Sequence, residues 1–264
     1  MFRLAESKLA AQRRVKAGAP GGIRTHDQLI KSQLLYQLSY RGDQTGGKFP
    51  TTYSFVNHAQ IRETSRVTEN FKPRDPEKFQ AALLRFDAEN SRDPNLEDSQ
   101  PRELLYAQRL TNWILKLCPD ASEGLRLAAR CQHICRWEIP RAFYPMTRPG
   151  YLKWRADLKK FHAQKSGEIL REAGYDEETI RRVQDLNLKK NFPNDPETRV
   201  LEDALCLVFL EFQFAALAAK TAEDKTINAL QKSWGKMTEA ARAEALKLNY
   251  PPREKALLQR ALEG

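Results

Sequence analysis

The sequence predicts an all-α fold, and three observations support this prediction. The tripeptide Asp-Pro-Glu occurs at 75–77 and again at 195–197, and it places a capping carboxylate and a first-turn proline at a helix start. Phe79, Leu83 and Phe86 recur at the spacing of one helical face. No apolar–polar alternation of the kind that forms half-buried strands is present.

The composition is that of a globular protein. The chain has 264 residues, of which 41% are hydrophobic, enough for one sizeable core. No apolar run approaches the roughly 18–20 residues of a membrane span, because Glu211 and Gln213 interrupt the longest one. No secretory signal accompanies the four cysteines, so we expect reduced thiols, a cytoplasmic location and no membrane partner. Cys131 and Cys135 lack zinc-ligand spacing and are predicted to be buried thiols.

The predicted helices follow from caps and breaks. We expect Asp120 and Glu123 to form a capping box, Gly174 to end a long helix, and Asp176 to cap the next one. The order is 76–90, about 102–117, 120–136, a Pro-rich connection at 137–149, a long helix to 173, one after 176, a central helix from 196, and two or three short helices ending at 261.

Charge divides the chain into two parts. Residues 1–72 hold 12 Lys/Arg and 5 Asp/Glu, whereas residues 73–264 hold 32 and 29. We therefore predict a disordered or artefactual N-terminal tail at 1–72 and a single helical domain at 73–264. Because the domain is nearly balanced, its overall charge does not support a nucleic-acid partner.

The tail also resembles a translated antisense tRNA gene. Gly22–Thr25 back-translates to GGG-ATT-CGA-ACC, the reverse complement of the T-arm consensus, and Leu34–Tyr40 back-translates to the reverse complement of the D-arm consensus. Residues 28–33 lie between them, and they can be encoded by codons whose opposite strand forms a stem around a loop centred on TTT. This pattern indicates a lysine tRNA gene; the alternative is a genuine disordered or targeting tail. His26-Asp27 is accordingly not counted as a metal-binding pair.

Two kinds of candidate site residue occur in the domain. His133 and His162 are its only histidines, and Glu202-Asp203 is either a helix-dipole feature or a ligand pair. A basic and aromatic set, suited to binding phosphate and stacking on bases, comprises Arg136, Trp137, Arg141, Tyr144, Arg148, Trp154, Arg155 and Lys159. The alternative for this set is a packed amphipathic loop. No phosphate-binding glycine loop or hydrolase motif is present.

Several short sequence segments resemble those of the family called domain of unknown function 4202. They are Leu105–Leu110, Arg130–Arg141, Tyr151–Arg155 with Phe161-His162, Gly174-Tyr175, and Leu201–Glu211. The resemblance runs from about Phe79 to the C-terminus. Some members are named glutamyl-tRNA synthetase, but the chain has neither an HIGH-like nor a KMSKS-like signature.

The family is also remotely similar to HD-domain metal-dependent phosphohydrolases, which implies an HD-like helical bundle. That resemblance implies a divalent metal held by His133, His162 and Asp203, with Glu202 assisting catalysis. It further implies that a phosphorylated or nucleotide substrate contacts the residues Gln132, Arg136, Arg141, Trp154 and Arg155. The sequence departs from the HD-domain pattern at Gln108, which stands where the first histidine of those enzymes would be.

Three functions remain open at this point. The first is a metal-dependent hydrolase of a small phosphorylated substrate. The second is a non-catalytic module that binds a nucleotide, RNA or a protein. The third is a purely structural interaction protein without a pocket.

The tRNA hypothesis makes a direct prediction about the gene. The strand opposite codons 21–42 is expected to fold into a cloverleaf with a lysine anticodon, which sequencing of the locus would show. Codons that cannot form such arms would instead identify residues 1–72 as a genuine tail.

Overall fold

The computed structural model describes residues 71–263 and confirms the all-α class. The tRNA hypothesis and the predicted tail concern residues that lie almost entirely outside this range. The α-helices are α3 (Pro76–Asn90), α4 (Arg102–Leu117), α5 (Glu123–Cys131), α6 (Arg148–Glu172), α7 (Glu177–Leu188), α8 (Pro196–Val208), α9 (Phe214–Lys220), α10 (Glu223–Trp234), α11 (Glu239–Leu246) and α12 (Pro252–Glu263). Short 3₁₀ turns η1 (Arg136–Glu138) and η2 (Arg141–Phe143) precede α6, and a π-helical turn η3 (Phe209–Gln213) joins α8 to α9.

Three of the predicted N-caps and the predicted glycine helix end form as expected. Backbone amides of Lys78, Thr179 and Thr198 donate to the carboxylates of the N-cap residues at 3.0, 2.7 and 2.8 Å respectively. These N-cap residues are Asp75, Asp176 and Asp195. Gly174 has φ +81°, the left-handed conformation that ends α6 and that residues with a Cβ adopt only at a cost.

Two local predictions were wrong, and one short element was not predicted. Ser122, rather than Asp120, caps α5, because its hydroxyl accepts from the Leu125 amide at 3.1 Å. The same helix ends at Cys131 instead of near Arg136, and Cys135 adopts a left-handed φ of 50°. A minimal antiparallel pair, β1 (Leu96–Glu97) with β2 (Gln100–Pro101), occupies the break before α4. Both thiols are nevertheless buried, as predicted.

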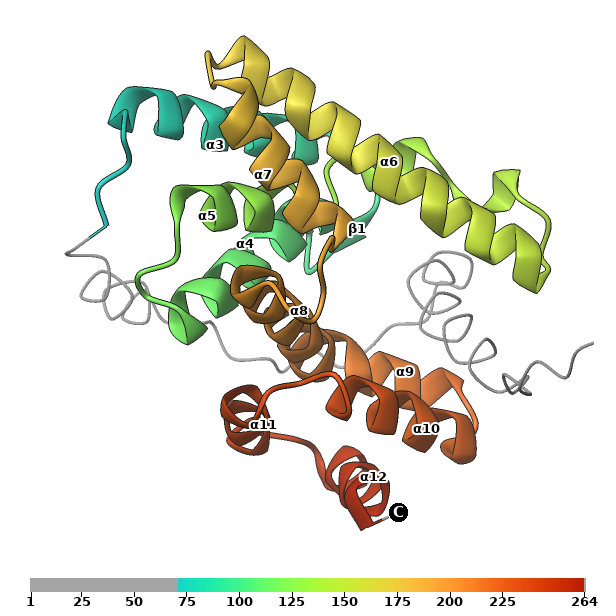
Figure 1. Ribbon diagram of the computed structural model, residues 1–264. Helices are drawn as coiled ribbons and strands as arrows, with labels where there is room; N and C mark the ends of the chain where they lie inside the picture. Colours follow the sequence, from blue (N-terminus) through green and yellow to red (C-terminus); the bar gives the residue numbers. More distant parts are fainter. Residues whose placement is uncertain (1–70, 264) are drawn as a thin grey trace, which may run out of the picture.

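Helix α8 lies at the centre of the described structure. Figure 1 shows α6 and α7 as an antiparallel pair on one side of α4 and α5, with α8 beyond these and α9–α12 farther out. Leu201, Ala204 and Leu207 of α8 are fully buried, which confirms the predicted central helix. No helix among residues 71–263 is long and apolar enough to cross a membrane.

Helix α6 extends well past its partner, because it has 25 residues and α7 has 12. Its projecting half and the preceding turns, residues 136–160, are called the arm below. The arm has its own small core of Tyr151, Trp154 and Leu158, against which Ile139 and Tyr144 pack. This small core supports the arm in addition to Trp137, which packs against the main core.

Gly150 fixes how the arm's loop packs on α6. A Cβ built on this residue would lie 2.2 Å from the Pro145 carbonyl oxygen, whereas one on Gly235 would meet nothing closer than 3.3 Å. We expect Gly150→Ala to displace the loop and cost about 1–3 kcal/mol of unfolding free energy. Urea denaturation of the two alanine variants would check this, and equal stability for both would contradict it.

Candidate functional site

Five cationic side chains converge from separate parts of the fold and are called the cationic cluster. They are Arg136 of η1, Arg155 and Lys159 of α6, Lys189 at the end of α7, and Lys236 between α10 and α11. Arg136, Arg155, Lys189 and Lys236 each act on the pKa of another group in the cluster or of the adjacent His133, and the pKa of Lys159 is lowered by three of them. Arg155 and Lys236 are exposed, whereas the side chains of Arg136 and Lys189 are only 16% and 21% exposed. The cluster thus runs from the surface inward.

Glu202 of α8 is the carboxylate bound directly by two of these cations. Its Oε2 accepts from Lys189 Nζ, and its Oε1 accepts from Lys236 Nζ at 3.2 Å. Burial raises the pKa of Glu202, but the charges and hydrogen bonds of the two lysines outweigh burial and bring this pKa to about 2. Glu202 is therefore an ionised structural partner of the lysines.

Positive charge exceeds negative charge in the cluster. Burial lowers the pKa of Lys159, and the charges of Lys189 and Arg155 lower it further. The pKa of Lys189 is also lowered by burial, although Glu202 opposes this. Five cations face Glu202 and the carboxyl of Glu103, which lies next to Arg136, so at least three positive charges have no matching carboxylate in this set. Such an excess favours an anionic ligand.

Glu103 and Tyr106 of α4 form a layer beneath the cluster with His133. The Tyr106 ring stacks on the His133 ring with centroids 4.2 Å apart. Glu103 Oε2 lies 3.5 Å from His133 Nδ1, and Glu103 Oε1 lies 3.8 Å from Arg136 Nε. Burial raises the pKa of Glu103 to about 7 despite the opposing charges of Arg136 and Arg102. This carboxyl can therefore gain or lose a proton near neutrality.

His162 of α6 lies beside His133, with ring centroids 5.8 Å apart. Its Nδ1 lies 2.8 Å from the Ile134 carbonyl oxygen, which can only accept, so Nδ1 carries the proton. The Nε2 atom is left with a lone pair, and it is buried without a hydrogen-bond partner among the described residues. Burial and the charges of His133 and Arg136 hold the pKa of His162 well below its usual value, so the ring is neutral.

The predicted metal ligands do not form a ligand set. Asp203 accepts from the backbone amide of Thr238 at 2.8 Å and from its hydroxyl at 2.6 Å, so both of its oxygens are used at the start of α11. Within residues 71–263, no group of three or more His, Cys, Asp or Glu side chains is arranged to hold a metal ion. The structure brings His133 and His162 together, but with Asp203 committed to Thr238 these residues do not fit the metal centre that the HD-domain resemblance implies.

The other predicted substrate-binding residues have different surroundings. Arg141 is 2% exposed and donates to the carbonyls of Tyr144, Pro145 and Thr147, so it stabilises the arm's loop. Trp154 is 1% exposed and donates from Nε1 to the Ile139 carbonyl at 2.9 Å, which leaves no free face for a base.

Of the remaining three predicted residues, Arg136 and Arg155 belong to the cluster. The guanidinium of Arg136 lies 5.1 Å from the centre of the Trp154 ring, and Arg155 is exposed. Gln132 is buried, and its Oε1 has no partner among the described residues. Of the five predicted substrate contacts, Arg136 and Arg155 therefore retain a position from which to bind phosphate.

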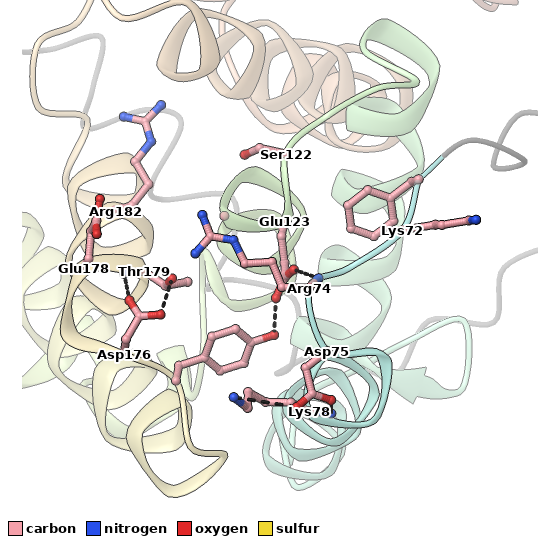
Figure 2. Close-up of a pocket in the computed structure, with 13 residues that line it drawn as sticks. Lys72, Arg74, Asp75, Lys78, Ser122, Glu123, Asp176, Glu178, Thr179 and Arg182 are labelled. Carbon is pink, nitrogen blue, oxygen red and sulfur yellow. Dashed lines mark hydrogen bonds and ion pairs between the residues drawn. The ribbon is translucent and has the colours of Figure 1, made fainter.

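A separate concavity of about 390 Å³ lies where α3, α5 and α7 begin (Figure 2). The helix caps there use the first-turn amides, and Glu123 accepts from the Arg74 amide and the Tyr175 hydroxyl at 2.9 and 2.7 Å. Four acidic and four basic residues line it: Asp75, Glu123, Asp176 and Glu178 with Lys72, Arg74, Lys78 and Arg182. Because its charges balance, this concavity is a weaker candidate for binding a charged ligand than the cationic cluster is.

A family model described as Domain of unknown function (DUF4202) matches residues 80–258. The chain belongs to this family. No curated protein and no solved structure matches the chain closely enough to show a relationship. These comparisons support neither the similarity to HD-domain enzymes nor the glutamyl-tRNA synthetase name. The match lies within the predicted 73–264 domain, whose boundary itself stays a prediction.

Sequence reasoning missed four contributors to the site of this DUF4202 domain. Glu103 and Tyr106 lie on α4, and the whole of α5 separates them from His133. Lys189 and Lys236 lie in separate connections farther along the chain. No local sequence pattern distinguishes these four residues from the many other residues of the same types in the chain. Only the packing of α4, α7 and α8 brings them together.

Glu103 predicts a specific pH dependence of stability. Because its folded-state pKa is raised from 4.5 to about 7, its stabilising contribution is complete below pH 4.5 and is lost as pH rises to about 7. As pH rises from 4.5 to about 7, we expect the free energy of unfolding of wild type to fall relative to that of Glu103→Gln. Urea midpoints measured at several pH values would check it. The exposed Glu239→Gln is the control, and identical pH profiles for wild type and Glu103→Gln would contradict the assignment.

Proposed function

We propose that the domain binds a small phosphorylated ligand whose phosphate neutralises the cationic cluster. The observation that carries this proposal is the charge excess at Lys159 and Lys189, whose pKa values are lowered by burial and by neighbouring cations. Folded proteins normally keep like charges apart, because their mutual repulsion in a partly buried site destabilises the folded state. A phosphate dianion would remove the repulsion and gain charge-assisted hydrogen bonds.

The arrangement of the cluster supports entry from the surface. Arg155 is exposed and supplies the planar donors that suit phosphate oxygens, whereas Lys189 lies deeper against Glu202. Because Glu202 is bound to Lys189 and Lys236, it holds these ammonium groups in place. A ligand would therefore meet positioned cations at little cost in side-chain ordering.

Hydrolysis of the bound ester is the second candidate, and Glu103 is the observation that favours it. A carboxyl with a pKa of about 7 suits proton transfer at neutral pH. Binding is the primary proposal, and turnover is tested beside it.

The experiment measures binding of inorganic pyrophosphate to the full chain by calorimetry and by thermal shift. We expect saturable binding and a rise in Tm for wild type. The double variant Arg155→Gln/Lys159→Gln is expected to weaken binding about tenfold or more, since it removes two charge-assisted contacts. The matched control is Lys153→Gln/Lys160→Gln, which removes two charges from another face of the same helix.

Equal loss in both double variants, or no binding to wild type, would contradict the proposed site. The same samples are assayed for release of phosphate from a chromogenic phosphate monoester, with and without added divalent cations. Turnover that Glu103→Gln abolishes while pyrophosphate still binds would assign hydrolysis to the site. Binding without turnover would leave the domain as a binding module.

A further inference from the structure

The positive charge of the domain is concentrated in the arm. Residues 136–160 contain seven Lys/Arg and two Asp/Glu, whereas residues 73–264 as a whole contain 32 and 29. The rest of the domain is therefore slightly acidic. A polyanion would be attracted to the arm and weakly repelled elsewhere.

Part of this charge forms a line that leads to the cationic cluster. At 100° per residue, Arg148, Leu152, Arg155 and Lys159 of α6 fall within one narrow strip of the helix surface. The strip is about 16 Å long, because eleven residues at 1.5 Å separate its ends. Arg148 and Arg155 are exposed, and Arg155 and Lys159 already belong to the cluster. Cations thus continue outward from the proposed phosphate site along the arm.

We propose that this strip of α6 binds the backbone of a single-stranded nucleic acid whose terminal phosphate enters the cationic cluster. The proposal rests on the proposed function, because the cluster supplies the terminal-phosphate site. A line of cations matches the phosphates of an extended strand, and a narrow strand end can reach a lysine that is 21% exposed.

The tip of the arm adds apolar surface of the kind on which bases stack. Phe143 is 78% exposed and Met146 is 64% exposed, and the bonds from Arg141 to three loop carbonyls hold the backbone around them. Exposed apolar residues beside cations also suit an anionic membrane surface. A flat bilayer contacts projecting groups, however, and a lysine side chain that is 21% exposed is less accessible to it than to the end of a strand. Nucleic acid therefore accounts for more of the observations.

The test uses fluorescence anisotropy with the full chain and labelled oligothymidylates of increasing length, carrying a 5′-phosphate, a 3′-phosphate or neither. We expect affinity to increase with length up to roughly 4–8 nucleotides and to depend on one of the terminal phosphates. Arg148→Glu should weaken binding of the longer oligonucleotides about tenfold and lower the slope of affinity against salt. It should leave pyrophosphate binding unchanged, because Arg148 lies outside the cluster.

Lys225→Glu is the matched control, since it also reverses a charge in the first turn of a helix, on α10. Both substitutions place an acid where the helix dipole favours one, so folding should be preserved. Equal affinity of the two variants for oligonucleotides, or no dependence on a terminal phosphate, would overturn the proposal.

Two further outcomes separate this inference from the proposed function. If wild type binds pyrophosphate but binds oligonucleotides no more tightly, the proposed strip on α6 is wrong and the proposed phosphate site stands. Failure of wild type to bind pyrophosphate would overturn the proposed function and this inference with it. If Arg148→Glu instead abolished binding only to phosphatidylserine vesicles, the arm would be a membrane-contacting element and the nucleic-acid proposal would be wrong.

Discussion

The buried carboxylate of Glu202 is the group on which the site and the surrounding helices depend. Its two oxygens bind Lys189, at the end of α7, and Lys236, between α10 and α11, so one side chain of the central helix connects three parts of the fold. Its neighbour Asp203 binds Thr238, the N-cap residue of α11. A buried charge that loses one partner is costly, so these contacts constrain one another and position the inner cations.

The same interaction explains why positive charge is tolerated inside the domain. Glu202 compensates part of the charge of two lysines, and the remaining excess is shared with Arg136, Arg155 and Lys159, which reach the cluster from η1 and α6. The net charge of the whole domain does not reveal this arrangement. A nearly balanced domain can hold a strongly basic arm when its acidic residues serve elsewhere as helix caps and ion-pair partners.

The arginines of the arm show how identical side chains acquire different functions. Arg141 is enclosed by three backbone carbonyls and stabilises the loop, whereas Arg155 remains exposed beside the cluster. Arg136 lies between Glu103 and the face of Trp154. The loop, packed closely against Gly150, therefore takes up the guanidinium of Arg141 and keeps it from a ligand.

The sequence alone determined the fold class, the helices that begin at Asp75, Asp176 and Asp195, and the helix end at Gly174, because capping depends on residues only a few positions apart. It also named His133 and His162 as candidate site residues, and the two rings lie 5.8 Å apart between centroids. Only the tertiary structure decided that Asp203 binds Thr238, that Glu202 binds lysines, and that Glu103 lies beneath the cluster. Those contacts join residues far apart in the chain, and their charges acquire their effect only when packing removes water around them.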